Sequence, residues 1–239
     1  EHSYLTTVTR QGVIRRTPLS QYRNIRKAGL NAVALNEGDS LVWSHLTNGE
    51  DDLIIATHDG AAIHFQEGDA RPMGRSGHGV RAIRLREGDY VVGVGVCRPG
   101  ATLLTVTEEG KGRRSLVDDY RTTKRGGLGI RNYAKGGVAA VKIVDDTDDL
   151  ILISANGILI RMHADDINIQ SRYGSGVRVM RLGEDDKVSM VARVERDNGA
   201  ETEKPEAEDD AEPTAEELAA IQAEEAADAA ADNADLSEE

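Results

Sequence analysis

The stretch Lys124-Arg125-Gly126-Gly127-Leu128-Gly129 is a short loop with two adjacent cations followed by three glycines in four positions. Related loops occur at residues 26–29, 75–79 and 172–176, and we call all four the basic loops. Spacings of 50, 50 and 47 residues separate their final glycines, which are Gly29, Gly79, Gly129 and Gly176. Glycine reaches positive φ without steric cost, and arginine offers a planar fork of donors that suits phosphate oxygens. The spacing therefore predicts a repeating scaffold that presents cations along a path.

A second set of glycines keeps the same rhythm. Each closes a turn after an apolar run, and Asp59-Gly60 and Asn156-Gly157 are typical hairpin signals. Spacings of 48, 50 and 47 residues separate the members of this set, which are Gly12, Gly60, Gly110 and Gly157. Two independent markers with one period predict internal repeats.

Each repeat contains segments with the character of four short strands. The first is an apolar run, typical of a strand buried on both faces, at residues 5–8, 53–56, 103–106 and 150–153. A second, more polar strand is predicted at residues 13–16, 61–65, 111–114 and 158–162. A third, with alternating polarity, is predicted after the basic loop at residues 81–85 and 178–182. The fourth strands are predicted at residues 41–44, 90–96, 138–144 and 188–194.

Four strands in about 50 residues is the size of a propeller blade. We predict an all-β propeller with blades at about residues 1–47, 48–99, 100–146 and 147–196. One blade cannot bury both of its faces, so neighbouring blades must stack. The alternative is a β-solenoid, whose repeats are usually shorter and contain fewer strands.

The charge of the chain is divided unevenly. Residues 197–239 contain 17 acidic residues and one lysine, so residues 1–196 carry a net charge of +3 although the whole chain carries −13. The acidic segment has no aromatic residue and too little apolar surface to offset the entropy of ordering, so we predict that it is disordered. Good helix formers at residues 216–231 would allow a transient helix there. The low overall isoelectric point does not exclude a nucleic-acid partner for the body.

Positive charge recurs in phase with the repeats. Four residues before the final loop glycine stand Arg75, Arg125 and Arg172, and the first repeat has Arg26 and Lys27 near that position. Further candidate cations lie in the loop, just after its glycine or in the second strands, and are Arg15, Arg16, Arg81, Arg113, Arg114, Lys124, Arg131, Arg161 and Arg178. One basic loop alone is more often a solvated turn, but four in phase place cations on one edge of every blade. Such an edge suits the phosphates of a bent duplex, which set position without reading bases.

Other chemistries find little support in the sequence. Cys97 is the only cysteine, and none of the six histidines pairs with a cysteine or carboxylate at metal-ligand spacing, so we predict no metal site. The chain has neither a Walker A sequence nor a nucleophile elbow, so we predict no active site. Only Tyr173 among the eight aromatic residues lies in a basic loop, which favours duplex over single strands. We predict no membrane segment and a cytoplasmic location.

The repeats and the phrase from Tyr120 to Ile130, Tyr-Arg-Thr-Thr-Lys-Arg-Gly-Gly-Leu-Gly-Ile, resemble the C-terminal domain of the DNA gyrase A protein. The signature box of that family reads Gln-Arg-Gly-Gly-x-Gly. Four positions match it, with Lys124 in place of the Gln, and they are Arg125, Gly126, Gly127 and Gly129. Because this loop stands in the third repeat, we expect it to be a related loop of a later blade, with two further blades before Glu1.

The resemblance implies a six-bladed β-pinwheel that wraps duplex DNA with right-handed geometry. It also implies an ATP-hydrolysing type IIA topoisomerase of A2B2 composition, in which this part joins gyrase B and a second copy of gyrase A through a region outside this sequence. The catalytic tyrosine and the ATP and Mg²⁺ sites of such an enzyme lie elsewhere, so no cofactor is expected here and the expected role is DNA wrapping for negative supercoiling.

Two alternatives remain open, namely the equivalent domain of topoisomerase IV and a propeller that binds proteins instead of DNA. A further hypothesis concerns the acidic segment at residues 197–239. Because it and DNA are both polyanions, we expect it to compete with DNA for the cationic edge.

Overall fold

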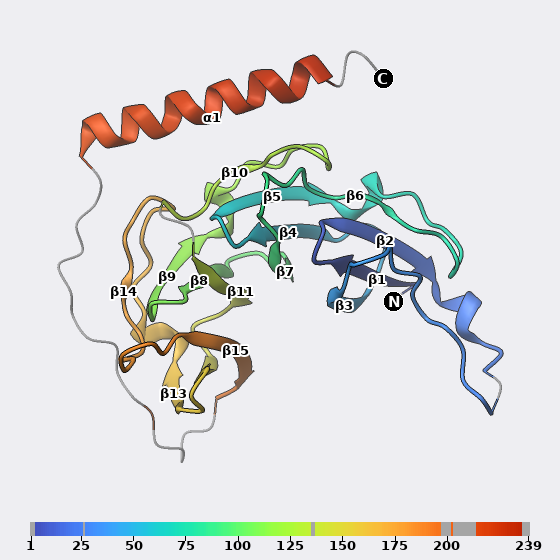
Figure 1. Ribbon diagram of the computed structural model, residues 1–239, viewed down its shortest axis with the longest axis horizontal. Helices are drawn as coiled ribbons and strands as arrows, with labels where there is room; N and C mark the ends of the chain where they lie inside the picture. The colour runs from blue at the N-terminus through green and yellow to red at the C-terminus, as the bar shows by residue number, and fades with distance from the viewer. Residues whose placement is uncertain (1–2, 26, 135–136, 197–201, 203–213, 236–239) are drawn as a thin grey trace.

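The structure is a computed structural model that describes residues 3–25, 27–134, 137–196, 202 and 214–235. Its strands form four antiparallel sheets that follow one another along an open arc, and a long α-helix lies outside the arc (Figure 1). This is the all-β repeating architecture that the two glycine rhythms predict.

The predicted first, second and fourth strands of every repeat are present. In chain order the strands and 3₁₀ helices are β1 (Tyr4–Thr9), β2 (Val13–Pro18), η1 (Leu19–Tyr22), β3 (Leu41–Thr47), β4 (Asp52–Thr57), β5 (Ala61–Gln66), η2 (Glu67–Asp69), β6 (Val80–Arg81), β7 (Val91–Val96), β8 (Thr102–Thr107), β9 (Lys111–Leu116), η3 (Val117–Asp119), β10 (Ile130–Arg131), β11 (Val138–Val144), β12 (Asp148–Ser154), β13 (Leu159–His163), η4 (Ala164–Asp166), β14 (Val177–Arg178) and β15 (Val188–Glu195). The α-helix is α1 (Ala215–Asp235).

The sheets exchange strands, which the sequence pattern does not predict. The first three sheets have the orders β3-β1-β2-β6, β7-β4-β5-β10 and β11-β8-β9-β14. In each, the edge strand beside the second strand of the repeat comes from the following repeat, and these edge strands are β6, β10 and β14. The predicted third strands at residues 81–85 and 178–182 are accordingly wrong in length and partner: only β6 and β14, two residues each, pair, and they pair with the preceding repeat. The open edge of each second strand offers unpaired backbone groups that this short strand satisfies. Each of these three sheets therefore extends beyond the predicted blade boundary.

Apolar side chains fill the spaces between neighbouring sheets. On β4, Leu53 and Ile55 belong to the cluster shared with the first repeat, whereas Ile54 and Ala56 belong to the cluster shared with the third. Successive residues of a strand point to opposite faces, so a strand that is buried on both faces must be apolar throughout. This explains the continuous apolar runs in the first strands.

One buried polar side chain crosses each junction between sheets. The Nε atom of Arg16 donates to the Ala70 carbonyl at 3.0 Å, and Nε of Arg114 donates to the Ile167 carbonyl at 2.7 Å. At the middle junction Nδ1 of His64 lies 2.8 Å from the Tyr120 carbonyl. All three side chains are buried, so each lost hydrogen bond would leave a desolvated donor and acceptor. We call these the junction hydrogen bonds.

The last sheet contains only β13, β12 and β15 within the described residues. Its Arg161 stands where Arg16 and Arg114 stand in their repeats, and it bonds inside its own sheet, with Nε 2.9 Å from the Asp149 carboxylate. Leu159, at the outer edge of this sheet, is 60% exposed. Among the described residues, no strand covers the edge that the other sheets fill with a strand of the next repeat.

The acidic segment differs from the predicted disorder at residues 215–235, which form α1 over the helix formers noted at residues 216–231. The helix begins with a reciprocal capping box, in which Thr214 Oγ1 accepts from the Glu217 amide at 3.3 Å and the Glu217 carboxylate accepts from the Thr214 amide at 2.8 Å. Residues 197–201, 203–213 and 236–239 lie outside the described residues. In the described part of the chain, no helix has the length and apolar character needed to cross a bilayer.

The strand exchange leaves no room for a side chain at the final glycines of the second, third and fourth basic loops, which are Gly79, Gly129 and Gly176. At Gly129, with φ of +77°, a Cβ atom would lie 2.5 Å from the Ala62 carbonyl oxygen on the preceding sheet. At Gly29, with φ of +79°, a Cβ atom would meet nothing within 4 Å. We expect Gly129→Ala to lower the free energy of unfolding by about 3 kcal/mol or more and Gly29→Ala by about 1 kcal/mol, as measured by urea denaturation. Equal losses would contradict the close approach of the loop to the preceding sheet.

Candidate nucleic-acid interface

Each basic loop after the first is held on the outer edge of the preceding sheet at both ends. The loop at residues 75–79 begins after a parallel bridge between Arg16 and Pro72 and ends at β6, which pairs with β2. The loops at residues 124–129 and 172–176 have the same two contacts, to β5 and to β9. In Figure 1 the short strands β6, β10 and β14 all lie on the convex side of the arc. The folded repeats therefore display these loops in a row along one outer edge.

Arginines that precede the final glycine connect neighbouring loops. Nη1 of Arg75 donates to the Asn31 carbonyl at 3.0 Å, Nη1 of Arg125 to the Arg81 carbonyl at 2.9 Å, and Nη1 of Arg172 to the Arg131 carbonyl at 2.8 Å. The accepting residue stands two positions after the final glycine of the previous loop in each case. This regular link makes the row continuous from one repeat to the next.

The other candidate cations differ in exposure. Lys27, Arg81, Lys124 and Arg178 are exposed, whereas Arg75, Arg125, Arg131, Arg161 and Arg172 are partly buried. Arg26 lies outside the described residues. Arg161 belongs to the last sheet, where it pairs with Asp149, and no basic loop of a following repeat reaches it in the described chain. The exposed members are the most accessible to a large ligand.

Four predicted phosphate contacts are corrected, because their side chains are buried. The exposed fractions of the whole residues are 3% for Arg15, 6% for Arg16, 1% for Arg113 and 4% for Arg114. Arg16 and Arg114 make junction hydrogen bonds. Arg15 and Arg113 instead hold the basic loops: Nη1 of Arg15 donates to the Arg75 and Gly77 carbonyls at 2.8 and 3.0 Å.

Arg113 supports its loop in the same way as Arg15. Nη1 donates to the Arg172 and Gly174 carbonyls at 2.6 and 2.9 Å, and Nη2 donates to the Asn132 carbonyl at 2.5 Å. The Asn132 side chain also accepts from the Tyr120 hydroxyl at 2.6 Å, which gives that buried tyrosine a place in the same network. The sequence pattern placed both arginines among the candidate cations of the second strands, and an arginine is rarely buried unless it is paired. Here backbone carbonyls of a loop from the next repeat supply the pairing.

Several exposed cations of the same edge were not among the predicted site residues. Arg71 and Arg121 occupy equivalent positions 50 residues apart, just before their loops, and both are exposed. Arg86, which is exposed, and Arg84, which is partly buried, line a cavity of about 370 Å³ together with Arg131. The repeat alignment that located the loops carries the signal for Arg71 and Arg121, because they recur in phase.

The glycines of the basic loops allow backbone conformations that other residues rarely adopt. Gly29, Gly79, Gly126, Gly129 and Gly176 all have positive φ, between +77° and +90°. Gly127 is not among the residues with positive φ, and its carbonyl accepts from the Arg84 amide at 2.8 Å. The glycines thus allow tight turns and close backbone approach, which brings the loop arginines to the edge.

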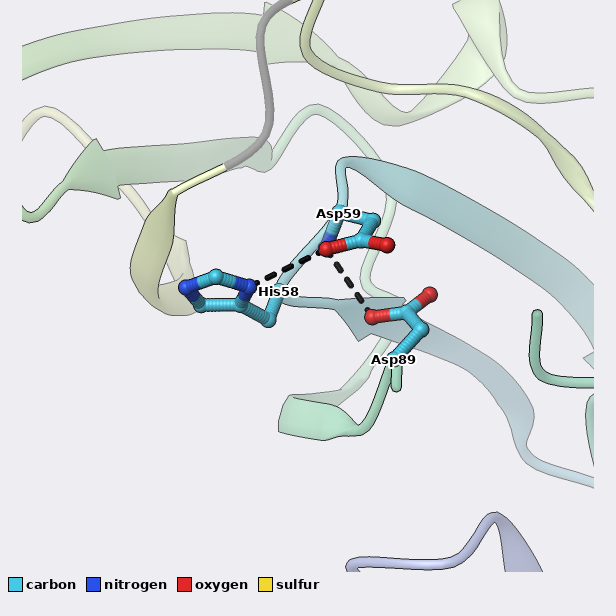
Figure 2. A group of neighbouring side chains, drawn as sticks. All are labelled: His58, Asp59 and Asp89. Carbon is cyan, nitrogen blue, oxygen red and sulfur yellow. Dashed lines mark hydrogen bonds and ion pairs between the residues drawn. The ribbon is translucent and has the colours of Figure 1, made fainter. Parts of the chain in front are cut away.

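His58, Asp59 and Asp89 form a cluster whose potential ligand atoms for a cation lie within 4.8 Å of one another (Figure 2). The two aspartates already have backbone or imidazole partners: Asp89 Oδ1 accepts from the Asp59 and Tyr90 amides, and Asp59 Oδ1 lies 3.1 Å from His58 Nδ1. Asp39 and Asp186, the turn aspartates of two other repeats, make the same pair of amide hydrogen bonds. In those repeats the position of His58 is occupied by Arg10 and Ala155. The cluster is therefore explained by turn formation.

Comparison with known proteins identifies the repeats. A family model described as "DNA gyrase C-terminal domain, beta-propeller" matches residues 3–48, 51–98, 101–146 and 148–195. The gyrase A protein of Clostridium acetobutylicum is 41% identical over 210 residues, which cover 86% of this chain and 25% of that protein. The gyrase A protein of Staphylococcus aureus is 38% identical over 212 residues, which cover 86% and 24%. The chain spans about a quarter of the length of the curated relatives it matches.

Solved structures of C-terminal domains from both DNA gyrase and topoisomerase IV are similar to this chain. The C-terminal domain of DNA topoisomerase IV matches with a TM-score of 0.77 and 25% identity, over 82% of this chain and 62% of that one. A DNA gyrase A C-terminal domain matches with a TM-score of 0.72 and 27% identity, over 80% and 66%. The E. coli ParC C-terminal domain, with a TM-score of 0.58 and 15% identity over 82% of this chain and 80% of that one, supports the fold alone.

The burial of Arg113 leads to a prediction about loop support. Arg113→Met removes the donors of three carbonyls, so we expect the free energy of unfolding to fall by about 3 kcal/mol and amide exchange in residues 171–175 to accelerate. Urea denaturation and hydrogen exchange measure the two effects. The control is Arg193→Met, because the Arg193 side chain is 42% exposed and its loss should cost about 0.5 kcal/mol or less. Similar losses in the two variants would contradict the role of Arg113.

Cys97 provides a test of the interior that is independent of the basic loops. Burial, with a smaller contribution from the Asp52 carboxylate, raises the pKa of the Cys97 thiol to about 12. At pH 8 only about one thiol in ten thousand is then ionised, so we expect iodoacetamide to react slowly and the rate to rise about tenfold per pH unit up to pH 11. The chain unfolded in urea, with an ordinary thiol pKa, is the control. A plateau near pH 9 in the folded chain would contradict this assignment.

Proposed function

Because this chain belongs to the DNA gyrase C-terminal domain family, we propose that it binds duplex DNA along the convex edge of its arc and bends the duplex around that edge. The observation that supports this most strongly is the row of basic loops, linked by Arg75, Arg125 and Arg172. The row brings a guanidinium to each junction between repeats. Evenly spaced cations on a convex surface match a ligand whose charge is also evenly spaced and which can curve.

The proposed ligand is a duplex and not a single strand. Proteins that bind single strands present aromatic platforms on which bases stack. In the described basic loops the aromatic side chain is Tyr173, and the Arg172 guanidinium lies over its ring at 4.2 Å from the centroid. Cationic groups without stacking platforms contact phosphates, so binding should be insensitive to base sequence and steeply dependent on salt.

Bending follows from the position of the loops. The loops lie on the outside of an arc, so a curved duplex can follow the row further than a straight one. Smooth bending of a short duplex costs on the order of 1–6 kcal/mol, and additional phosphate contacts can offset that cost. The wrapping geometry implied by the family, right-handed and used for negative supercoiling, belongs to this proposal.

The larger enzyme also belongs to the proposal. We place the chain in the gyrase A protein of an ATP-dependent, cytoplasmic type IIA topoisomerase, with gyrase B and a second copy of gyrase A as partners, and with the catalytic tyrosine, ATP and Mg²⁺ outside this sequence. The equivalent part of topoisomerase IV is the second candidate, because a solved structure of that domain has a TM-score of 0.77 with this chain. The gyrase assignment is favoured by the curated relatives at 38% and 41% identity, both of them gyrase A proteins.

A charge-neutralising variant tests the interface. Arg81, Lys124 and Arg178 are exposed on three different segments of the edge and are replaced together by Gln. We expect affinity for a mixed-sequence duplex to fall by about tenfold or more at about 0.1 M salt, and the salt slope to decrease by about 0.9 for each lost phosphate contact. Fluorescence anisotropy over a range of salt concentrations measures both quantities.

The matched control removes three cations outside the basic loops, namely Arg98, Lys187 and Arg193, which pair with acidic residues. We expect a smaller loss of affinity and a nearly unchanged slope. If the control weakens binding as much as the edge variant, the interface is wrong. If tail-less residues 1–196 do not bind duplex at all, the alternative of a protein-binding propeller is favoured.

A further inference from the structure

The four repeats differ at one buried position of the second strand, and the difference alternates along the chain. In chain order this position holds Arg15, Ile63, Arg113 and Ile160. Two further positions alternate in the same way. One holds Thr7, Ile55, Thr105 and Leu152, and the other holds Tyr22, Ala70, Tyr120 and Ile167. The first and third repeats are therefore polar at positions where the second and fourth are apolar.

In the polar repeats, the guanidinium on the second strand supports the basic loop of the next repeat. Nη1 of Arg15 donates to the Gly77 carbonyl at 3.0 Å, and Nη2 donates to the Ala32 carbonyl at 2.9 Å. Gly77 lies in the second basic loop, and Ala32 lies just after the first. Arg113 makes the two equivalent hydrogen bonds one loop pair further along the row. The buried guanidinium thus joins two neighbouring loops by satisfying one carbonyl of each.

The apolar second repeat has no guanidinium at this position, and backbone amides take its place. The Ala82 carbonyl, which is equivalent to that of Ala32, accepts from the Gly126 amide at 2.7 Å. The Gly127 carbonyl, at the position of Gly77 in its loop, accepts from the Arg84 amide at 2.8 Å. The third basic loop is therefore joined directly to the segment that follows the second.

The additional glycine of the third basic loop accompanies this change. Gly126 has a φ of +90°, a conformation that residues with side chains rarely adopt. The loops supported by Arg15 and Arg113 carry Ser76 and Tyr173 at the same position, and neither residue has a positive φ. A glycine with positive φ therefore occurs where the backbone supplies the hydrogen bond, and a larger residue occurs where a buried arginine supplies it.

Both arrangements pair carbonyl groups of the basic edge with donors of the protein. A carbonyl oxygen carries partial negative charge, so an unpaired one facing the duplex would repel phosphates, whereas amide and guanidinium groups attract them. Arg15 and Arg113 are only 3% and 1% exposed, so the carbonyls that they bind are directed into the protein. The surface left for a ligand is then richer in donors and cations.

We propose that Arg15, Arg113 and Gly126 are positioning residues for duplex binding, and that the buried guanidinium and the glycine with positive φ are two alternative supports for a basic loop. None of the three contacts DNA in this arrangement; each holds the loop that does. The inference rests on the proposed function, because it identifies what shapes the loops of the same edge. The two supports should be exchangeable between repeats, whereas removing one without adding the other should weaken binding.

The test exchanges the support of the third basic loop in the full-length chain. Gly126→Ser disfavours the positive φ and with it the hydrogen bond to Ala82, so we expect affinity for a mixed-sequence duplex of about 40 base pairs to fall about fivefold at about 0.1 M salt. Adding Ile63→Arg supplies the guanidinium that the other loops use, so we expect I63R/G126S to recover to within about twofold of the unmodified chain. Fluorescence anisotropy measures these affinities.

A glycine outside the basic loops provides the matched control. Gly38 has a φ of +73° in a turn of the first repeat, and a Cβ atom there would meet nothing within 4 Å. Gly38→Ser introduces the same kind of backbone strain, and we expect duplex affinity to change by less than about twofold. Adding Ile63→Arg to G38S should bring no gain, which separates specific support of the loop from general stabilisation.

The reverse exchange in the second basic loop decides the question if a chain with Ile63→Arg does not fold. Arg15→Ile removes the donor of the Arg75, Gly77 and Ala32 carbonyls, so we expect affinity to fall about fivefold. Adding Ser76→Gly allows the loop to close through its own amide, so R15I/S76G should recover to within about twofold. S76G alone should change affinity by less than about twofold.

Hydrogen exchange gives a readout without DNA. The amides at positions 84 and 126 should exchange slowly in the unmodified chain and faster in G126S. They should stay fast in I63R/G126S although affinity returns, because the guanidinium and not the backbone then holds the carbonyls.

Recovery in either exchange supports the proposal. Unchanged affinity in both G126S and R15I, or failure of both I63R/G126S and R15I/S76G to recover, would overturn it. If the unmodified chain itself does not bind duplex, the proposed function fails instead, so the two failures are distinguishable.

Discussion

The structure depends on the burial of a hydrogen-bonded polar side chain between every two sheets. Arg16, His64 and Arg114 project from the second strands of their repeats. Each forms a hydrogen bond with a backbone carbonyl just after the 3₁₀ helix of the next repeat, and these carbonyls belong to Ala70, Tyr120 and Ile167. Burying a donor without a partner costs free energy of folding, so this hydrogen bond fixes the distance and the relative position of neighbouring sheets. The same junction determines where the chain crosses to the preceding sheet, and hence where each basic loop emerges.

The local sequence pattern predicted where the strands lie, but it could not predict which strands pair with one another. The period of the glycines and the apolar runs located β1, β4, β8 and β12 because alternation and turn chemistry are properties of neighbouring residues. The exchange of β6, β10 and β14 depends on which edge is open after folding, and that is not a local property. For the same reason Arg113 resembled a surface cation in the sequence, although its carbonyl partners come from a loop about 60 residues away.

The overall composition of the acidic segment also hid a local difference, because part of that segment forms a helix. The acidic tail has the overall balance of a disordered chain, yet Thr214 and Glu217 cap a helix and Glu225 is held by Arg131 and Arg172. A helix of this kind gains its stability from contacts as much as from propensity. The candidate edge was therefore predictable from the repeats, whereas its occupation by the chain itself required the positions of individual carboxylates.

Strand exchange has a consequence for synthesis on the ribosome. The first sheet lacks its outermost member until β6 has been translated, and the second and third wait in turn for β10 and β14. A nascent chain therefore always carries one unfinished sheet at its growing end, and the smallest stretch able to fold to completion is longer than one repeat. Maturation from the N-terminus should proceed in steps that lag translation by roughly 60 residues, the distance from each second strand to the strand that completes it.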